Sequence, residues 1–237
     1  IRQITERSFE KTLRMAIGSW LVEHEDIAII MCGMVGSAQG WYEAGYLSGQ
    51  IGVDELSSGM VKVPDTQLNV MIVPGIRGVS VAGLNDVVRG EETLLAGWLQ
   101  QPTDCETLFC LPGTHSKWIV AREGQVNQLT TFMTGELFSL LSEKSVLKHS
   151  IAKEGLDEKI FKSSIEEIIS NNKIFAAKVF GLRAESIIKS LSVSDARSRL
   201  SGYLIGLELS GSRAYWLGET VFILGEDSIS LAYEIGL

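Results

Sequence analysis

The sequence has few cysteines, and their arrangement excludes a structural metal site. Its 237 residues include three cysteines, Cys32, Cys105 and Cys110. An odd number with irregular spacing does not fit a zinc knuckle or a disulfide framework. We therefore expect buried, reduced thiols, as is usual for a cytoplasmic protein, and we assign no metal-ligating residue within this sequence.

Long apolar runs and targeting signals are also absent. The apolar stretch from Ile27 to Met34 is far too short to cross a bilayer. The first residues, Ile-Arg-Gln, include no initiator Met and start no signal-peptide pattern. We expect no membrane partner, a cytoplasmic location and a chain that begins inside a longer protein.

Positive charge is in deficit. The 21 Lys and Arg residues are outnumbered by 29 Asp and Glu residues, which gives a net charge of −8. This balance argues against a general nucleic-acid binder, because affinity for a phosphate backbone needs clustered Lys and Arg. A hydrophobic content of 45% excludes wholesale disorder. The length suits one large domain or two modest lobes.

Four common catalytic motifs are missing from the sequence: GxxxxGK[ST], GxGxxG after a strand, HExxH and GxSxG. Their absence argues against four classes of protein: Walker-type ATPases, dinucleotide oxidoreductases, zinc peptidases and α/β-hydrolases.

The pattern of apolar residues predicts alternating helices and strands. In the first part we expect a helix over 9–24, a strand over 27–32, a glycine-rich loop over 33–46, a strand over 70–74, a turn over 75–78, a helix over 91–100 and a strand over 107–111. A hairpin follows over 116–132, then a largely helical region over 135–210, a strand over 221–224 and a helix from 228. This order indicates an α/β protein with two lobes, 1–89 and 90–237.

The segment from Leu111 to Trp118 could bind phosphate. A glycine at the end of a buried strand, Gly113, is followed by Thr114, His115 and Ser116, so a tight turn would expose N–H groups and two hydroxyls. Lys117 could supply positive charge. The alternative is an ordinary hairpin entry, with His115 as a packed histidine.

The segment Asn85 to Thr93 places three carboxylates and Arg89 at the expected start of a helix. Phosphoryl transfer to a hydroxyl needs a carboxylate that accepts a proton and positive charge near the anionic groups. The alternative is that Glu91 and Glu92 favour the positive helix N-terminus while Arg89 pairs with Asp86.

Two further segments could contact ligands. In the loop after the first strand, Gly36 and Gly40 would let a substrate approach the backbone, Ser37 and Gln39 offer hydrogen bonds and Trp41 offers an apolar wall. The alternative is a connector with Trp41 in the core. Near the C-terminus, Gly225 and Ser228 could hold a nucleotide, or Asp227 or Ser228 could simply be a helix N-cap.

Together these segments resemble the 2-dehydro-3-deoxygalactonokinase family of bacterial sugar kinases. The matching strings, in the family's order, are CGMVGSAQGW (32–41), VPGI (73–76), DVVRGEET (86–93), LPGTHSKWIV (111–120), FMTGEL (132–137), LSGYLIGLEL (200–209) and the strand and glycine near 225. They cover the chain nearly end to end, and PGTHSKW together with RGEET is a specific combination.

The resemblance implies a ribonuclease-H-like (actin/hexokinase-like) α/β fold with two lobes around a cleft. It implies a kinase that uses ATP and Mg²⁺ to phosphorylate 2-dehydro-3-deoxy-D-galactonate at the 6-hydroxyl in galactonate degradation, and it is compatible with a homodimer. One alternative is a kinase of another sugar acid. Another is a non-catalytic actin-like protein that binds ATP or senses sugar.

The resemblance also implies roles for the segments above. Residues 113–116 correspond to a phosphate loop, Gly225 and Ser228 to the adenosine side, and CGMVGSAQGW to a substrate-facing loop. Glu91 is the expected general base, with Asp86 as the alternative. Arg77 and Arg89 are the candidates for the substrate's carboxylate.

Two motifs of the superfamily are not found. No Asp-x-Gly-Ser/Thr hairpin, which would hold Mg²⁺, precedes Phe9, and no closing Gly-Asp helix follows Leu237. We expect both to lie outside this sequence. A protein that lacks the hairpin altogether would favour the non-catalytic alternative.

Overall fold

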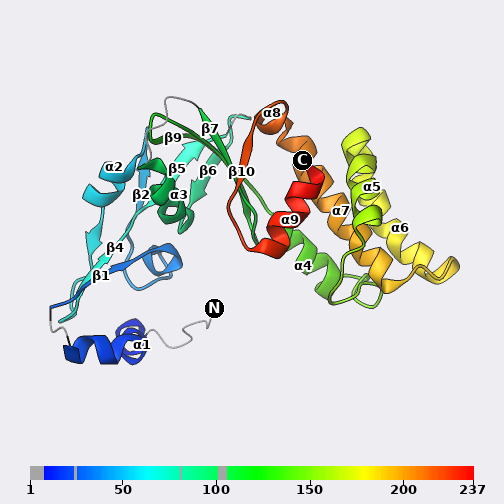
Figure 1. Cartoon of the computed structure of the whole chain (residues 1–237). Coiled ribbons are helices and arrows are strands. Elements are labelled where there is room, and N and C mark those ends of the chain that lie inside the picture. The colour runs from blue at the N-terminus through cyan, green and yellow to red at the C-terminus, as the bar shows by residue number, and fades with distance from the viewer. Residues whose placement is uncertain (1–7, 24–25, 81, 101–105) are drawn as a thin grey trace. The chain divides into compact units, whose positions relative to one another are not determined.

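The computed structural model describes residues 8–23, 26–80, 82–100 and 106–237, which form two compact units. The first unit lies within residues 1–106 and includes 121–129, and the second consists of 107–120 and 130–237. Figure 1 labels their helices and strands. The lobe boundary expected near Arg89 stays a prediction.

The first unit contains two small sheets. The parallel pair β1 (Ala28–Met31) and β4 (Asn69–Ile72) is extended by β3 (Val61–Lys62), and the second sheet has the order β2 (Tyr46–Ser48), β5 (Gly75–Val79) and β6 (Asn85–Val88). The described helices of this unit are α1 (Phe9–Glu23), η1 (Gly33–Gly36), α2 (Val53–Ser58) and α3 (Glu91–Leu99). Apolar residues on alternate positions of β4, Val70 and Ile72, are fully buried in its core.

One expectation for this unit was wrong, and one strand was not predicted. The turn expected over 75–78 is strand β5, because Ile76 pairs with Leu47 of β2 on one side and with Val88 of β6 on the other. Both pairing strands are separate elements of the chain, so the local pattern of residues did not predict this strand. Residues 85–88, for which no strand was predicted, form β6, and the helix predicted over 91–100 is confirmed as α3.

The second unit is built on a mixed sheet with the order β10-β7-β8-β9. Its strands are β7 (Thr107–Leu111), β8 (Ser116–Arg122), β9 (Gln125–Phe132) and β10 (Val221–Ile223). β10 runs parallel to β7, with Phe222 opposite Phe109. The predictions of strand β7, of the hairpin and of a strand near 221 are confirmed.

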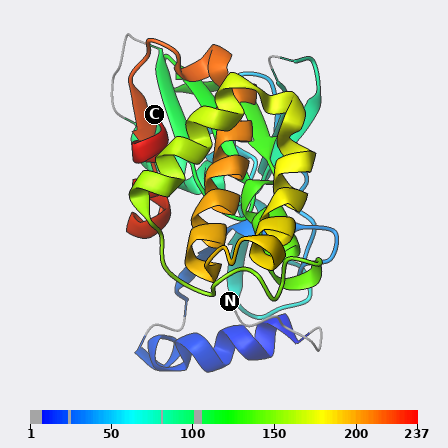
Figure 2. The ribbon, with the colours of Figure 1, turned by 90° about the vertical axis from the view of Figure 1, so that its right-hand side faces the viewer.

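The described helices of this unit are α4 (Thr134–Lys144), α5 (Glu158–Ser170), η2 (Asn172–Ile174), α6 (Phe175–Ile188), α7 (Val193–Gly211), α8 (Arg213–Trp216) and α9 (Asp227–Gly236). Figure 2 shows α7 between α5 and α6. Side chains cap two of these helices, since Asp157 accepts from the Ile160 N–H and Ser192 from the Asp195 N–H. Helices α5 and α7 can approach closely because Gly202 of α7 has no side chain. A methyl group there would lie 2.6 Å from the Phe161 carbonyl oxygen of α5.

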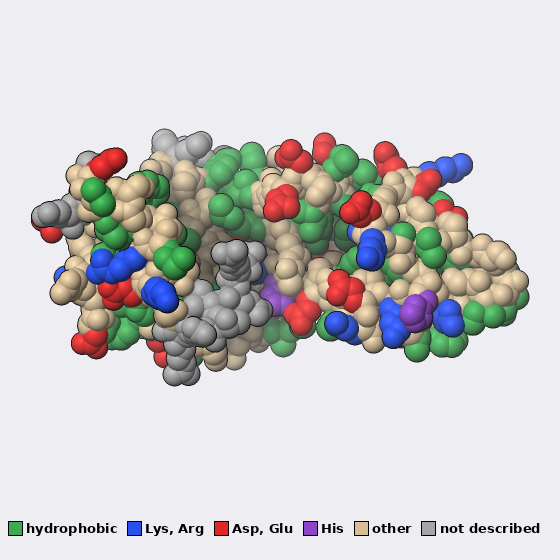
Figure 3. All heavy atoms as spheres, turned by 90° about the horizontal axis from the view of Figure 1, so that it is seen from below, with side chains coloured by type: hydrophobic (Ala, Val, Ile, Leu, Met, Phe, Trp, Pro, Cys, Tyr) green, Lys and Arg blue, Asp and Glu red, His purple; other side chains and the backbone are tan. Residues whose placement is uncertain are grey.

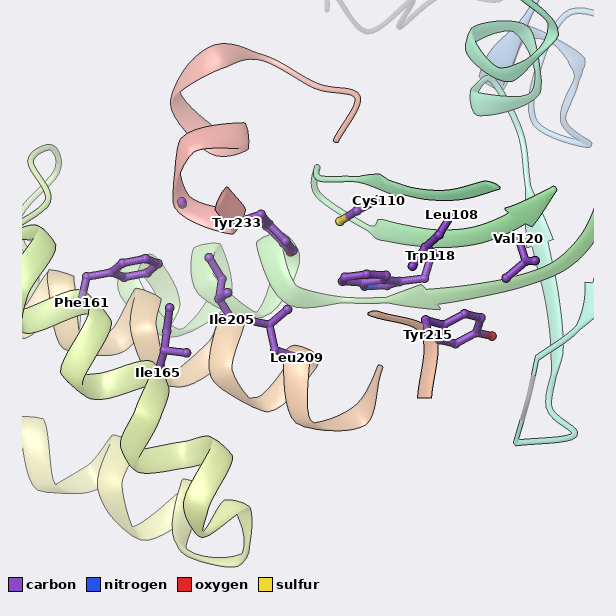
Figure 4. Packing of buried hydrophobic residues seen from close by; sticks show 11 residues of the cluster. Leu108, Cys110, Trp118, Val120, Phe161, Ile165, Ile205, Leu209, Tyr215 and Tyr233 are labelled. Atoms are coloured by element: carbon purple, nitrogen blue, oxygen red, sulfur yellow. The ribbon is translucent and has the colours of Figure 1, made fainter. Parts of the chain in front are cut away.

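The main core of the second unit joins the sheet to α5, α7 and α9. Figure 4 shows Trp118 from β8 and Tyr233 from α9 together with aliphatic side chains such as Ile165 and Ile205. Cys110 is buried here as predicted, whereas Cys32 is exposed, contrary to expectation. Cys105 lies outside the described residues.

None of the described helices is long and apolar enough to cross a membrane. On the face drawn in Figure 3, acidic and basic side chains are interspersed rather than gathered in one basic area.

Candidate functional site

The turn between β7 and β8 presents backbone N–H groups that have no hydrogen-bond partner in the described part of the chain. Residues 112–115 belong to neither strand. Among the described residues, the N–H groups of Gly113, Thr114 and His115 donate no hydrogen bond. Successive N–H groups of this kind form a concavity suited to an anion. Thr114 is also exposed, so its hydroxyl is accessible.

The carbonyl groups of this turn are held by neighbouring residues. The Glu136 N–H donates to the Thr114 carbonyl at 2.9 Å, and the Lys117 ammonium donates to the His115 carbonyl at 2.7 Å. His115 Nε2 lies 2.5 Å from a Glu136 carboxylate oxygen. Lys117 thus supports the turn's own backbone, and its expected role as a charge for phosphate stays a prediction.

Gly135, at the start of α4, lets that helix lie against the turn. A methyl group there would lie 2.4 Å from the Gly113 carbonyl oxygen and 2.9 Å from the Thr114 Cα. Both are backbone atoms, so no side-chain rotation can relieve the clash. We expect Gly135→Ala to lower the free energy of unfolding by about 1–3 kcal/mol, measured by urea unfolding.

The matched control for this change is Gly181→Ala in α6, where no atom lies within 4 Å of the added methyl group. Alanine favours helix more than glycine does, so this variant should gain about 0.5–1 kcal/mol. Equal effects of the two substitutions would contradict the packing argument.

A pocket of about 410 Å³ adjoins this turn, entirely within the second unit. Its lining comes from the turn, α4, α7, α9 and the loop before α5: Gly113, Thr134, Gly135, Phe138, Gly155, Leu156, Arg197, Ser201, Leu204, Ile205, Ser228, Ile229, Ala232 and Tyr233. The structure thus brings together two predicted positions, Gly113 and Ser228, that are far apart in sequence. Gly225 packs beside Pro112, at the base of the same turn. The volume is within the range of small-ligand pockets.

Arg197 is a charged residue in this largely apolar lining that the sequence analysis did not identify. Its guanidinium stacks on the Phe138 ring, 4.8 Å from the centroid, and donates to the carbonyl groups of Gly155 and Ala152 at 3.0 and 3.2 Å. Burial lowers its pKa, although an arginine stays charged. The spacing of apolar residues in α7 did not indicate that Arg197 would line a pocket.

A second group missed from sequence surrounds the buried carboxylate of Glu208, on α7. It accepts hydrogen bonds from Ser116, Trp118, Thr134 and Tyr233. The sequence did contain an indication of a buried carboxylate, because Glu208 is the single acidic residue in the apolar stretch from Leu204 to Leu209. Ser116 is fully buried with its hydroxyl 2.6 Å from Glu208, a placement that does not support its expected phosphate contact, which stays a prediction.

In the first unit, the loop after β1 lies against the segment that precedes α3. Gly33 and Gly90 both have positive φ angles, and a methyl group on Gly90 would lie 3.3 Å from the Gly33 Cα. A methyl group on Gly36 would lie 2.9 Å from Nη1 of Arg89. The motifs CGMVGSAQGW and DVVRGEET, separated in sequence, therefore meet in one unit.

Arg89 is the cation at this meeting point. Its guanidinium lies over the Tyr46 ring, 4.2 Å from the centroid, and donates to the Tyr46 hydroxyl and to the Gly45 carbonyl at 3.2 and 2.7 Å. Its buried Nη1 has no hydrogen-bond partner, and no ion pair among the described residues includes Arg89. A buried guanidinium nitrogen without a hydrogen-bond partner is costly, so an anionic ligand that accepts from Nη1 would relieve this arrangement.

The two glutamates that follow Arg89 differ in exposure. Glu91 is half-buried, and its carboxylate accepts from the Arg89 N–H at 3.1 Å. Glu92 is fully buried, and one of its oxygens accepts from the Gly90 N–H at 2.5 Å. Both therefore also satisfy N–H groups at the start of α3, as the structural alternative proposed. Asp86 lies on β6, where its side chain accepts from the Val87 N–H.

Glu92 gives rise to a prediction about pH. Burial raises its pKa above the usual 4.5, against the opposing effect of its hydrogen bonds to backbone N–H groups. Between these two values the folded state binds more protons than the unfolded state, so stability falls as pH rises. We expect this fall to be smaller in Glu92→Gln between pH 4.5 and neutral pH, measured by urea unfolding. Parallel curves for the two proteins would contradict it.

The remaining predicted residues of the first unit have different environments. Ser37 is buried, and its hydroxyl donates to the Met34 carbonyl at 2.8 Å, while Gln39 is exposed. Trp41 stacks on Phe9, with ring centroids 6.2 Å apart, and packs against the core, as the structural alternative expected. Arg77 is exposed on β5, with Nη2 3.5 Å from the Ser48 hydroxyl. Their substrate-binding roles stay predictions.

No group of three or more His, Cys, Asp or Glu side chains that could hold a metal ion occurs in the described part of the chain.

Comparisons with known proteins give a consistent result. A family model described as 2-keto-3-deoxy-galactonokinase matches residues 1–237. A Rhizobium meliloti protein named as a probable 2-dehydro-3-deoxygalactonokinase is 35% identical over 191 residues, 79% of this chain and 62% of its own length. The Escherichia coli protein named 2-dehydro-3-deoxygalactonokinase is 34% identical over 191 residues, 81% of this chain and 63% of its own length.

A solved structure is also similar. It is a crystal structure from Sinorhizobium meliloti, described as that of a candidate 2-dehydro-3-deoxygalactonokinase, with a TM-score of 0.86 and 32% sequence identity over 97% of this chain and 77% of its own. The chain spans less than two thirds of the length of the two curated relatives.

Proposed function

The chain belongs to the 2-keto-3-deoxy-galactonokinase family, and on this premise we propose that it transfers the γ-phosphate of ATP to the 6-hydroxyl of 2-dehydro-3-deoxy-D-galactonate. We also propose the actin/hexokinase-like arrangement of two lobes, 1–89 and 90–237, and a cytoplasmic location. The proposal rests on the names of the relatives and on the chemistry of the two units.

One observation carries the nucleotide half of the proposal: the N–H groups of residues 113–115, which have no hydrogen-bond partner among the described residues, lie at the edge of a pocket large enough for a nucleoside. Phosphates would accept from these N–H groups and from the Thr114 hydroxyl. Phe138 and Ile229 offer apolar contacts to a base. Arg197 has only donors, which suits the ring nitrogens of adenine that accept hydrogen bonds.

The acceptor half of the proposal falls on the first unit. The substrate is a carboxylate, and Arg89 is a guanidinium without an ion-pair partner among the described residues. We assign Arg89 to the carboxylate in preference to Arg77, which is exposed. Glu91, two residues after Arg89 in the chain and half-buried, is the proposed base, with Asp86 as the alternative.

In the proposed reaction the 6-hydroxyl oxygen attacks the γ-phosphorus as the bond to the β-phosphate oxygen breaks. The hydroxyl proton passes to the Glu91 carboxylate, and ADP leaves. Mg²⁺ supplies charge neutralisation when it accompanies ATP. The described residues include no carboxylate cluster that could hold it, so its protein ligands are not assigned. Positioning and electrostatics would supply most of the rate enhancement.

The test is an assay of ADP release from ATP with 2-dehydro-3-deoxy-D-galactonate and a panel of other sugar acids. We expect turnover that depends on the acid, a product phosphorylated at the 6-position by NMR, and the highest kcat/KM for the named substrate. A higher value for another acid would replace the substrate but keep the kinase. ATP binding without turnover on any acid would leave the sensing alternative.

A further inference from the structure

The Glu208 carboxylate lies in the core of the second unit and is only 2% exposed. One of its oxygens accepts from the Trp118 indole N–H at 2.8 Å. The other accepts from the hydroxyls of Ser116 at 2.6 Å, Tyr233 at 2.7 Å and Thr134. None of the ion pairs formed within the described ranges includes Glu208. This buried acid is therefore compensated by neutral donors alone.

The hydroxyl donors come from the elements that shape the pocket. Ser116 directly follows the 112–115 turn at the start of β8. Thr134 and Tyr233 themselves line the pocket, from α4 and α9. Next to Thr134 is Gly135, whose Cα lies against the Gly113 carbonyl. A single carboxylate oxygen thus joins the turn and two walls of the pocket.

A buried carboxylate is a poor way to obtain stability alone, because well-packed apolar groups of similar volume often do as well or better. Hydrogen bonds to a charged acceptor are shorter and stronger than those between neutral groups, and they fix the donors' orientations. Burial and the neighbouring Glu208 raise the pKa of the Tyr233 phenol, so Tyr233 remains a donor. These features fit a group that sets the geometry of its neighbours.

We propose that Glu208 is a positioning residue for the nucleotide, which fixes the phosphate turn through Ser116 and the pocket walls through Thr134 and Tyr233. The inference rests on the proposed kinase function. It predicts that disturbing this cluster weakens nucleotide binding by the folded protein, because turn and walls no longer hold the bound geometry in advance.

The test is calorimetric titration of the purified protein with ADP, together with thermal unfolding. The variants are Glu208→Gln, Tyr233→Phe and the double variant. In Glu208→Gln the amide oxygen can still accept from Trp118, and two of the three hydroxyls of Ser116, Thr134 and Tyr233 can rotate to accept from the two amide N–H groups, so folding should survive. Binding stoichiometry reports the folded fraction, and Kd reports the site.

We expect the Kd for ADP to rise about tenfold in Glu208→Gln and about three- to tenfold in Tyr233→Phe. If Tyr233 acts through Glu208, the double variant should be no weaker than Glu208→Gln. In steady-state assays KM for ATP should rise more than kcat falls. Ser164→Ala removes a comparably buried hydroxyl of α5 that does not line the pocket, so its Kd should stay within about twofold.

Each other outcome is decisive. Variants that melt earlier but bind ADP with wild-type Kd would reduce Glu208 to a structural role and overturn this inference, with the kinase proposal intact. Wild-type protein that binds no ADP would remove both. If Glu208→Gln does not fold, the Kd values for ADP of Tyr233→Phe and Thr134→Val test the inference instead, and wild-type values in both variants would overturn it.

Discussion

Replacement of Glu91 by glutamine is expected to lower kcat by about 10²–10⁴, the usual contribution of a general base. The amide cannot accept the proton of the sugar hydroxyl, but its oxygen can still accept from the Arg89 N–H as Glu91 does, so the start of α3 should be preserved. The Kd for ADP should be unchanged, because Glu91 does not line the pocket of the second unit. Steady-state kinetics with titration of ADP measures both quantities.

Asp86→Asn is the control for that experiment. Asp86 lies on β6, five residues before Glu91 in the chain, and its side chain binds the adjacent N–H of Val87. We expect a change in kcat of less than about tenfold, since surface-type substitutions have small effects. Near-normal turnover in Glu91→Gln combined with a large loss in Asp86→Asn would move the base to Asp86.

Replacement of Arg89 by methionine is expected to lower kcat/KM for the sugar acid by about 10²–10³. Removing one member of a desolvated, hydrogen-bonded charge pair costs about 2–5 kcal/mol. Methionine keeps much of the side-chain volume, and the variant also loses the donations to Gly45 and Tyr46. Arg89→Lys should recover only part of the loss, because an ammonium cannot bind a carboxylate through a planar pair of donors.

The specific readout for Arg89 is the preference for the acid over an analogue in which the carboxylate is a primary alcohol. This preference should fall in Arg89→Met, whereas turnover of the neutral analogue should change little. Arg77→Met is the matched control, since Arg77 is exposed on the neighbouring strand β5. An unchanged preference in Arg89→Met with a lost preference in Arg77→Met would exchange the two assignments.

Much of the local structure could be predicted from the sequence. Strand β7 has the predicted bounds Thr107–Leu111, and α3 begins at Glu91 directly after Gly90, which has a φ angle of +108°. Apolar runs, glycines and capping residues specify such features because their effects act within a few residues. Two site residues predicted from widely separated motifs, Gly113 and Ser228, also line one pocket.

Side-chain direction could not be predicted in the same way. Ser116 follows the turn as expected of a phosphate ligand, but its hydroxyl is directed at Glu208, 92 residues further along the chain. Strand β5 was missed because its partners are Leu47 and Val88. In both places a residue distant in sequence decides the outcome, and a local pattern contains no information about it.

The sequence by itself determined the alternation of helices and strands, the family resemblance and the candidate residues for phosphate binding and proton transfer. Only the tertiary structure placed Arg89 beside Gly36 without an ion-pair partner among the described residues, and the Glu208 carboxylate against Ser116 at the end of the 112–115 turn. The reason is physical: backbone conformation follows from neighbours along the chain, whereas burial and hydrogen-bond partners are set by residues that meet only when the chain folds.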